Sequence, residues 1–373
     1  MKTVFFLVNY TPDDQSIGIT KKISGQISAL RKLGYNVYYT CYKNEGVAIC
    51  NNNDSIVATE KFKTKNGKIN RLLRYNLLLH LAYQYITTSN IRYNYCYARI
   101  SAATNRYVSI LRTMHNQGAK VIVEMLSYFP GIKPKTIKSK YLWFFVKRNI
   151  GQLQSVIDKV ITEGEIKDFY GIPSEKGRIG VNVDTLPVHH YIGNKDELNL
   201  ISVGNEREYH GYDRLIFSYK EYLKHNEKVK ITIHIVGEVS KRTKAMITPD
   251  LSDKVILYGK LYGEELKTIY NKCNLGVGPL AQHRIGGKKD TGLKTKEYLG
   301  IGIPYIYSGV EEDLPNEFPY VYRIPADESI IDFASIWEFY KKIRDNSKMS
   351  EEMRNIAKET LSWDSIMKKA LSF

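Results

Sequence analysis

The spacing of hydrophobic residues along the chain changes repeatedly between the pattern of buried strands and that of amphipathic helices. An apolar run at 3–8 predicts a buried strand. Ile23 and Ile27 then recur at helical spacing, and Gly34 ends the predicted helix. Apolar residues at 37–39 predict the next strand. Together these segments form a βαβ unit.

The alternation continues along the chain and restarts near residue 200. Further strands are predicted at 93–97, 121–125, 200–203, 231–236, 255–258, 275–277 and 305–307, and further helices at 72–86, 108–114, 214–223, 263–270, 295–299 and over most of 330–373. Strands that alternate with helices predict parallel, doubly wound sheets. We therefore expect an α/β protein with two Rossmann-like domains, at 1–185 and 186–355, that face one another across a cleft. A C-terminal helix at 356–373 is expected to pack back on the first domain.

The length and composition agree with a protein of this kind. The chain has 373 residues, enough for two domains, and no apolar run approaches the roughly 18 residues of a membrane-spanning helix. The start, MKTVFFLVNY, lacks the small-residue cleavage site of a signal peptide. Its four cysteines include no CxxC pair, which argues against a disulfide framework or a zinc site. We expect a cytoplasmic protein with reduced thiols and no metal.

The net charge of +16 favours an anionic partner: nucleic acid, anionic lipid or a phosphorylated small molecule. Composition alone does not distinguish these partners. A codon-biased genome would explain the excess of positive charge equally well. One segment, 133–149, places six Lys and Arg residues beside Trp143, Phe144 and Phe145. This pattern predicts peripheral contact with an anionic membrane, and the alternative is a core helix with a solvated cationic edge. No recognised nucleic-acid motif accompanies it, so nucleic acid is not expected as a partner.

The segment richest in candidate chemistry is 279–306, which follows a predicted strand and leads into a predicted helix. Its basic residues and the start of that helix predict a phosphate site, because helix N-termini and lysines attract anions. Glu297 lies near the same helix start and suits the hydroxyls of a ribose. The alternative is a solvated basic loop in which Glu297 merely interacts with the helix dipole.

The same segment resembles the retaining glycosyltransferases of the GT-B fold, in particular glycosyltransferase family 4. Gly292, Leu293, Glu297, Gly302 and Pro304 match the second part of that family's acidic motif. The resemblance implies a nucleotide-sugar donor, with a UDP sugar expected, held around 292–304 by Gly292, Leu293, Thr295 and, at the ribose, Glu297. Eight residues before Glu297 stands Lys289, where the family has a glutamate.

The tract SVGNEREYHGYDRLI resembles the family's diphosphate site, but Asn205 and His210 stand where the family has arginine and lysine. A branch that acts in bacterial capsule and exopolysaccharide assembly is more similar, through the strings YHGYDRLI, HRIGG and LKTKEY. By this resemblance Arg284 and Lys294 supply the missing positive charge. The alternative for His210 is a loop histidine packed on Tyr209 or Tyr212.

In the N-terminal half the resemblance rests on fewer residues. Gly18 stands where the family's glycine-rich loop approaches the sugar phosphate. Arg99, Glu124 and Tyr128 match positions of the same branch and are assigned to the acceptor side, with Glu124 following a strand. The alternative for Glu124 is an ion pair with Arg99.

The resemblance implies a hexosyltransferase that moves a sugar from a nucleotide to a glycan or lipid-linked glycan, with retention at the anomeric carbon, in bacterial surface-polysaccharide synthesis. His210, Glu124, Arg284 and Lys294 are the candidate catalytic residues, and no cofactor besides the donor substrate is expected. The alternative function is a catalytically silent GT-B subunit that binds glycan or stabilises a partner transferase. If the protein binds a membrane peripherally, we expect it on the inner face of the plasma membrane.

Overall fold

The computed structural model describes residues 1–12, 18–64, 66–99, 102–125, 137–162, 168–225, 229–286, 292–311, 314–315 and 317–373. The chain forms two compact units: unit 1 is Met1–Arg178 together with Trp363–Phe373, and unit 2 is Ile179–Ser362. The sequence placed the divisions after 185 and before 356. The second division lies further along because the helix Met349–Leu361 packs within unit 2.

Unit 1 is built on a nine-stranded sheet of order β4-β3-β2-β1-β5-β6-β7-β9-β8. Its strands are β1 (Thr3–Leu7), β2 (Asn36–Lys43), β3 (Gly46–Cys50), β4 (Ile56–Lys61), β5 (Tyr95–Arg99), β6 (Lys120–Met125), β7 (Lys159–Thr162), β8 (Asp168–Phe169) and β9 (Ile172–Lys176). The central strands are parallel, whereas β3, β4 and β8 pair antiparallel with their neighbours. The parallel core agrees with the predicted alternation.

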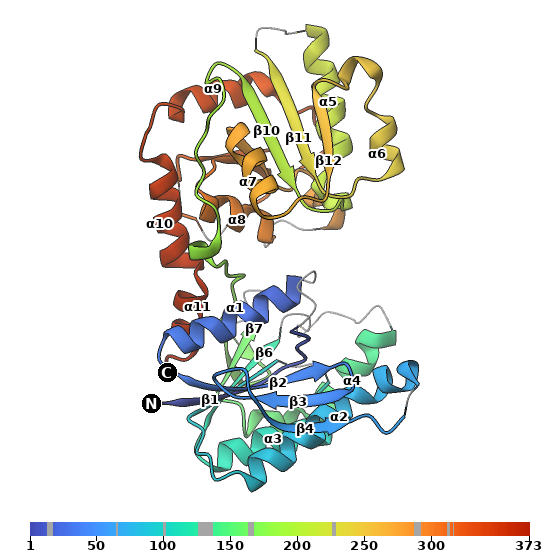
Figure 1. The fold of residues 1–373 in the computed structure, drawn as a ribbon, viewed down its shortest axis with the longest axis vertical. Coiled ribbons are helices and arrows are strands. Elements are labelled where there is room, and N and C mark those ends of the chain that lie inside the picture. The colour runs from blue at the N-terminus through green and yellow to red at the C-terminus, as the bar shows by residue number, and fades with distance from the viewer. Residues whose placement is uncertain are drawn as a thin grey trace. The chain divides into compact units, whose positions relative to one another are not determined.

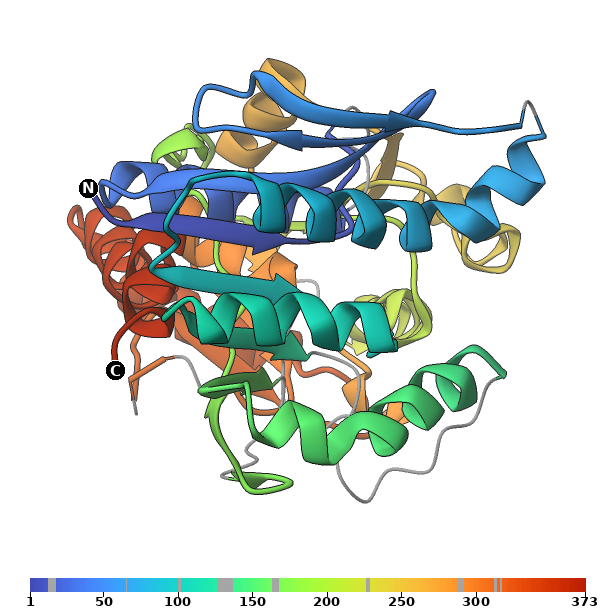
Figure 2. The same ribbon diagram turned by 90° about the horizontal axis from the view of Figure 1, so that it is seen from below.

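Helices cover both faces of this sheet. One face carries α2 (Gly67–Thr88), α3 (Asn105–Asn116) and α4 (Ile137–Gln154) side by side, and the other carries α1 (Gly18–Lys32) and α11 (Trp363–Ala370), as Figures 1 and 2 show. The strand β1 is buried along its whole length because apolar side chains meet it from both faces. Two clusters of buried residues, one on each face, form the core of unit 1.

Unit 2 has a six-stranded, wholly parallel sheet of order β12-β11-β10-β13-β14-β15. Its strands are β10 (Leu198–Val203), β11 (Ile231–Val236), β12 (Val255–Gly259), β13 (Leu275–Val277), β14 (Tyr305–Ser308) and β15 (Val321–Ile324). Its helices are α5 (Tyr212–His225), α6 (Lys241–Ala245), α7 (Gly263–Lys272), α8 (Leu293–Ile301), α9 (Phe333–Ile343) and α10 (Met349–Leu361), visible in the upper part of Figure 1. A single cluster of buried residues forms its core.

The predicted strands and helices are confirmed, with ends that differ by a few residues. The sequence did not predict β3, β4, β7, β8, β9 or β15, which are short or lie toward the edges of their sheets. All four cysteines are buried and none is in a disulfide, as expected for reduced structural thiols. Among the described residues no helix is both long and apolar enough to cross a membrane.

Candidate functional site

The candidate site lies at the carboxyl ends of β10, β13 and β14 in unit 2. In parallel sheets the loops at this edge form the ligand sites, because all the strands end there. The turn after β10 and the loop after β13 lie against each other, since the backbone amides of Leu280 and Ala281 donate to the carbonyls of His210 and Tyr209 at 3.2 and 3.0 Å. The helix α8 begins beyond the loop after β13.

The helix α8 is fixed at both ends by glycine. Gly292 stands in extended conformation at its N-cap. Gly302 ends it with φ +83°, and a Cβ there would overlap Ser350 at the start of α10. The end of the helix is therefore packed against α10 with no space to spare, which fixes the direction in which the first turn of α8 points. Gly292, Leu293, Lys294 and Thr295 form that end of the helix.

Lys294 is a buried cation at this edge. Lys294 is only 8% exposed. Its Nζ donates to Ser202 Oγ in β10 at 3.0 Å and lies 5.4 Å from the ring centroid of Tyr212. A Cβ added to Gly204, just after β10, would lie 3.8 Å from Lys294 Cε and 3.9 Å from His210 Cε1. Gly204, His210 and Lys294 therefore converge, although they are far apart in sequence.

His210 is buried and uncharged at neutral pH. Burial, followed by the charges of Lys294 and Arg207, lowers the pKa of His210 to about 3. The ring packs edge-on to Tyr209 at 4.7 Å and tilted on Tyr212 at 5.5 Å, so the packing described by the alternative interpretation is present. Its Nδ1 is nevertheless buried without a hydrogen-bond partner among the described residues. Buried polar atoms are normally satisfied, so this nitrogen is suited to a ligand group.

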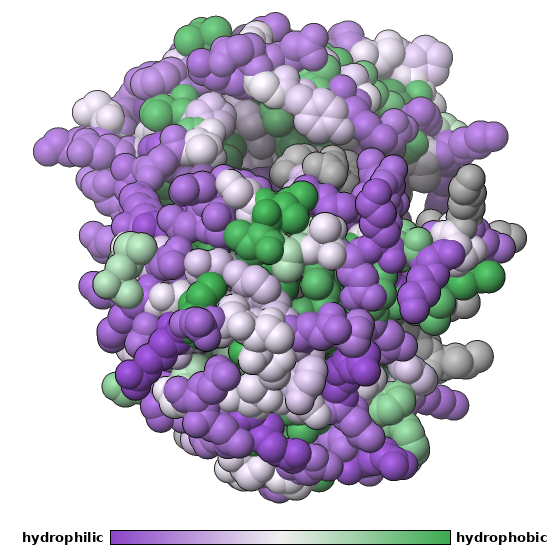
Figure 3. Space-filling model, turned by 60° about the horizontal axis from the view of Figure 1, so that its bottom comes forward, coloured by the Kyte–Doolittle hydropathy of each residue, from purple (hydrophilic) through white to green (hydrophobic). Residues whose placement is uncertain are grey.

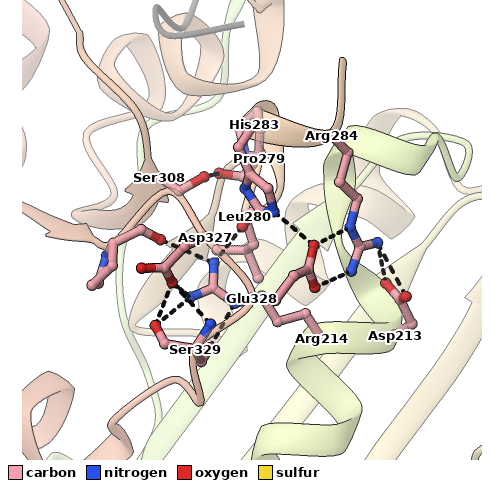
Figure 4. Close-up of polar contacts among 11 residues, drawn as sticks. Asp213, Arg214, Pro279, Leu280, His283, Arg284, Ser308, Asp327, Glu328 and Ser329 are labelled. Atoms are coloured by element: carbon pink, nitrogen blue, oxygen red, sulfur yellow. Dashed lines mark hydrogen bonds and ion pairs between the residues drawn. The ribbon is translucent and has the colours of Figure 1, made fainter. Parts of the chain in front are cut away.

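Arg284 belongs to a network of ion pairs, drawn in Figure 4. It lies in the short helix Gln282–Ile285 and donates to both oxygens of Asp213 at 2.8 and 3.0 Å, and to Glu328 at 2.7 Å. Hydrogen bonds from Arg284 and then His283 lower the pKa of Glu328 to about 2. Arg284 thus connects the loop after β13 to α5 and to the segment after β15, and two carboxylates balance its charge.

A second ion pair lies beneath the first turn of α8. Lys296 and Glu311 are paired with both side chains almost fully buried, and Thr295 Oγ1 donates to the other oxygen of Glu311 at 3.2 Å. Glu311 follows β14, so the pair joins α8 to the loop at the end of that strand. These contacts hold the first turn of α8, which carries Lys294, against the end of β14.

The remaining predicted donor residues are placed as follows. Glu297 is half-buried on the second turn of α8 and lies near Tyr270 and Tyr298, whose pKa values are raised first by burial and also by its charge. The exposed Asn205 accepts a hydrogen bond from the amide of Glu238 at 3.0 Å and so joins the loops after β10 and β11. Gly18 is the first residue of α1 in unit 1. Lys289 lies outside the described residues.

In unit 1 the predicted acceptor residue Glu124 is buried at the end of β6. It pairs with Lys22, and it accepts hydrogen bonds from Gln26 at 2.9 Å and Tyr97 at 3.0 Å. Burial raises the pKa of Glu124, but Lys22 and then Arg99 outweigh burial and leave it below its ordinary value. The ion pair is therefore made with Lys22, and Arg99 acts from further away.

The pocket beside Glu124 is small, with room of about 30 Å³. That volume suits one or two water molecules rather than a sugar ring. In this conformation Glu124 is thus fully engaged within unit 1. Tyr128, the other predicted acceptor residue, lies outside the described residues. No group of three or more His, Cys, Asp or Glu side chains in the described part of the chain is placed to hold a metal ion.

Several residues of these clusters were not predicted from the sequence: Ser202, Asp213, Glu311, Glu328, Lys22 and Gln26. Lys22 and Gln26 gave a usable signal, because they stand four residues apart on the same side of a predicted helix as its apolar residues. Ser202 and Glu311 gave none, since their partners lie in other elements.

The comparisons with known proteins bear on the fold. No family model and no curated protein matches the sequence. Among solved structures, a glycosyltransferase from Rickettsia africae ESF-5 has a TM-score of 0.62 at 14% identity, covering 99% of this chain and 97% of that one. The trehalose-6-phosphate synthase OtsA has 0.55 at 12% identity, covering 99% and 98%, and TarM has 0.54 at 13%, covering 100% and 98%. At such identities the likeness establishes the architecture alone, and the chain has the GT-B fold.

Proposed function

We propose that the chain is a glycosyltransferase that moves a hexose from a nucleotide sugar, with a UDP sugar as first choice, to a glycan or lipid-linked glycan. Retention at the anomeric carbon and a role in bacterial surface-polysaccharide synthesis are part of the proposal. The GT-B fold over the full chain is consistent with it. The observation that carries it is the convergence of Lys294, His210 and the start of α8 at one sheet edge.

Lys294 is the residue to which we assign the diphosphate. Its ammonium is buried, so its charge acts in a medium of low dielectric constant, where it stabilises a developing anion more strongly than an exposed lysine would. The donor phosphates would lie at the N-terminal end of α8, between Lys294 and the unpartnered Nδ1 of His210. The uncharged imidazole would add a hydrogen bond to the ligand and no net charge.

The remaining assignments extend this arrangement. Glu297 would accept hydrogen bonds from the ribose, and Arg284 would contact phosphate only after exchanging one of its carboxylates. On the acceptor side, Arg99 and Glu124 would position the incoming hydroxyl, with Glu124 released from Lys22 when the acceptor binds. The departing phosphate is the group that we expect to take the hydroxyl proton, so catalysis depends on positioning and on stabilisation of the leaving group.

The proposal is tested by binding and turnover of the purified full-length chain. A thermal-shift screen of UDP, GDP, CMP and dTDP sugars identifies the donor, and calorimetry then measures its affinity for the variant Lys294→Met. We expect donor affinity to fall roughly 10- to 100-fold, the usual effect of removing a charge-assisted hydrogen bond. Lys272→Met, an exposed lysine of the same unit, is the matched control. Unchanged affinity in a folded Lys294→Met variant would overturn the assignment.

The alternative function, a silent subunit that binds glycan or a partner transferase, predicts a different result. Such a chain would neither hydrolyse nor transfer from any nucleotide sugar when supplied alone. Transfer or donor hydrolysis by the purified chain therefore excludes it. The absence of both, together with donor binding no tighter than that of Lys294→Met, would favour it.

A further inference from the structure

The excess positive charge of the chain lies entirely in unit 1. That unit contains 29 Lys and Arg against 12 Asp and Glu, whereas unit 2 contains 26 against 27. A genome-wide bias toward lysine would raise the count in both units alike. The uneven distribution therefore indicates a surface of unit 1 whose charge has a specific purpose.

Within unit 1, one face of the sheet is free of acidic residues in its helices. The helices α2, α3 and α4, which lie side by side on that face in Figure 2, contain three, two and four Lys and Arg residues respectively and no Asp or Glu. Of these cations, Arg106, Arg112, Lys140, Lys147 and Arg148 are exposed. We call this surface the basic helical face. With no carboxylate in these three helices, their charges are balanced by no acidic neighbour on the same helix.

The helix α4 also exposes aromatic side chains among these cations. It packs on the core through Val146, Leu153 and Asn149, whose side chain donates to the carbonyl of Ala103 at 2.7 Å. Tyr141 and Phe144 lie on its outer side and are 55% and 54% exposed. The helix α4 is thus packed on the core, as the alternative interpretation of 133–149 has it, and it also exposes large apolar groups, while membrane contact stays a prediction. Residues 133–136 lie outside the described part of the chain.

The exposed residues of α4 follow helical spacing. Lys140, Tyr141, Phe144, Lys147 and Arg148 fall on one stripe, with cations at both ends and aromatic rings between them. Lys147 Nζ lies 3.7 Å from the ring centroid of Trp143, which keeps its charge at the border of the aromatic group. Apolar rings flanked by cations are the arrangement that fits the boundary between lipid head groups and acyl chains.

A second apolar pair lies at the start of α2. Ile69 and Leu73 stand four residues apart and are exposed. In Figure 2 α3 lies between α2 and α4, and Tyr141 and Phe144 stand in the first turns of α4 as Ile69 and Leu73 do in α2. Both helices begin at the carboxyl edge of the sheet, since each follows a strand that runs toward that edge. The apolar groups of the basic helical face therefore gather at one end of it.

We propose that the basic helical face of unit 1 docks on an anionic lipid bilayer, with Tyr141, Phe144, Ile69 and Leu73 entering the head-group region and Arg106, Lys140, Lys147 and Arg148 binding lipid phosphates. The exposed aliphatic side chains Ile69 and Leu73 distinguish this occupant from nucleic acid, which rewards cations and aromatic rings that stack on bases but not aliphatic groups. Figure 3 shows hydrophilic side chains over most of the surface in view, with hydrophobic ones in small groups. Docking of this kind depends on charge and on a few apolar anchors together.

The test is co-sedimentation of the full-length chain with vesicles of phosphatidylcholine, with and without phosphatidylglycerol. We expect binding to the anionic vesicles only. The variant Lys140→Glu/Lys147→Glu/Arg148→Glu should weaken binding roughly 100-fold or more, and Tyr141→Ser/Phe144→Ser roughly 10-fold. The controls are Lys241→Glu/Arg242→Glu/Lys244→Glu on the exposed side of α6 and Phe217→Ser, a phenylalanine of unit 2 that is 51% exposed. Thermal unfolding shows that each variant folds.

Three outcomes overturn the proposal: no binding to anionic vesicles, equal losses in the control variants, or loss in the charge variant alone together with tight, salt-sensitive binding of an oligonucleotide. The last outcome would identify the face as a nucleic-acid surface. Because sedimentation requires neither donor nor turnover, failure here leaves the proposed transferase activity untouched, and failure of the activity leaves this result standing.

Discussion

The two units share an architecture but differ in how they use charge. Unit 1 has a net charge of +17, much of it on exposed helix surfaces, whereas unit 2 is nearly neutral at −1 and places its notable charges in buried or half-buried pairs. The interactions of a cation in water are screened and its side chain can move, whereas a buried cation interacts strongly from one fixed position. The difference suits unit 1 to a broad anionic surface and unit 2 to a small anionic ligand.

The largest expected effect comes from breaking the buried pair of unit 2. Lys296→Met removes the ammonium paired with the buried carboxylate of Glu311 and should lower the free energy of unfolding by about 3–5 kcal/mol. Urea denaturation measures it. Lys22→Met in unit 1 should cost less, because Gln26 and Tyr97 continue to donate to Glu124. A larger loss for Lys22→Met would contradict this ranking.

Acidification should destabilise unit 2 before unit 1. The pKa values of His210 and His234, both buried in unit 2, are lowered by burial to about 3 and about 4. Unfolding allows these rings to take up protons below an ordinary pKa of about 6.5, so stability falls as the pH drops through the window between 6.5 and 4. We expect on the order of 2 kcal/mol from each by pH 4.5.

Hydrogen exchange at pH 7 and pH 4.5, resolved by unit, checks this prediction. Protection should fall first in peptides of unit 2. His234→Gln should remove part of the pH dependence, because it removes one of the buried histidines whose pKa is lowered, the others being His189 and His210. Equal loss of protection in both units would show that the buried histidines do not set the acid sensitivity.

The two units end a helix in the same way but with different space around the glycine. Gly34 ends α1 and Gly302 ends α8, both at φ +83°. Gly34→Ala should cost about 1 kcal/mol from backbone conformation alone, since no atom lies within 4 Å of the added Cβ. Gly302→Ala should cost about 2–3 kcal/mol, because the methyl group also meets Ser350. Thermal or urea unfolding separates the two, and similar costs would mean that α10 moves aside.

An effect smaller than that of Gly302→Ala is expected at Arg284. Arg284→Lys keeps the charge but loses the paired hydrogen bonds to Asp213 and Glu328, and we expect a loss of about 1–2 kcal/mol in stability with little change in donor affinity. Calorimetry with the donor and urea unfolding together give the answer. A large loss of affinity at unchanged stability would instead show that the guanidinium group itself, and not its charge alone, is needed at the phosphate.

The fold was predictable from sequence because it depends on local periodicity. Strands β1, β6, β10 and β11 are apolar runs closed by polar turns, and their alternation with helices is visible residue by residue. The short strand β15 was missed, since four residues with only partial burial carry no clear period. Edge strands of this kind depend on pairing with a neighbour that the sequence does not identify.

The candidate site was predictable by residue type but not by pairing. Lys294 was assigned to phosphate, yet its neighbours Ser202 and Gly204 lie about ninety residues earlier in the chain and meet it only after folding. The same long separation concealed Glu328 as a partner of Arg284. Side-chain chemistry can be read from sequence, whereas charge neutralisation depends on contacts between distant elements.

The two ion-paired clusters beside α8 have a consequence for how the site can vary. The Arg284 network ties the short helix Gln282–Ile285 to α5 and to the segment after β15, and the Lys296–Glu311 pair ties α8 to the end of β14. Because the two clusters share no residue, either one can change in evolution while the other keeps its own element in place.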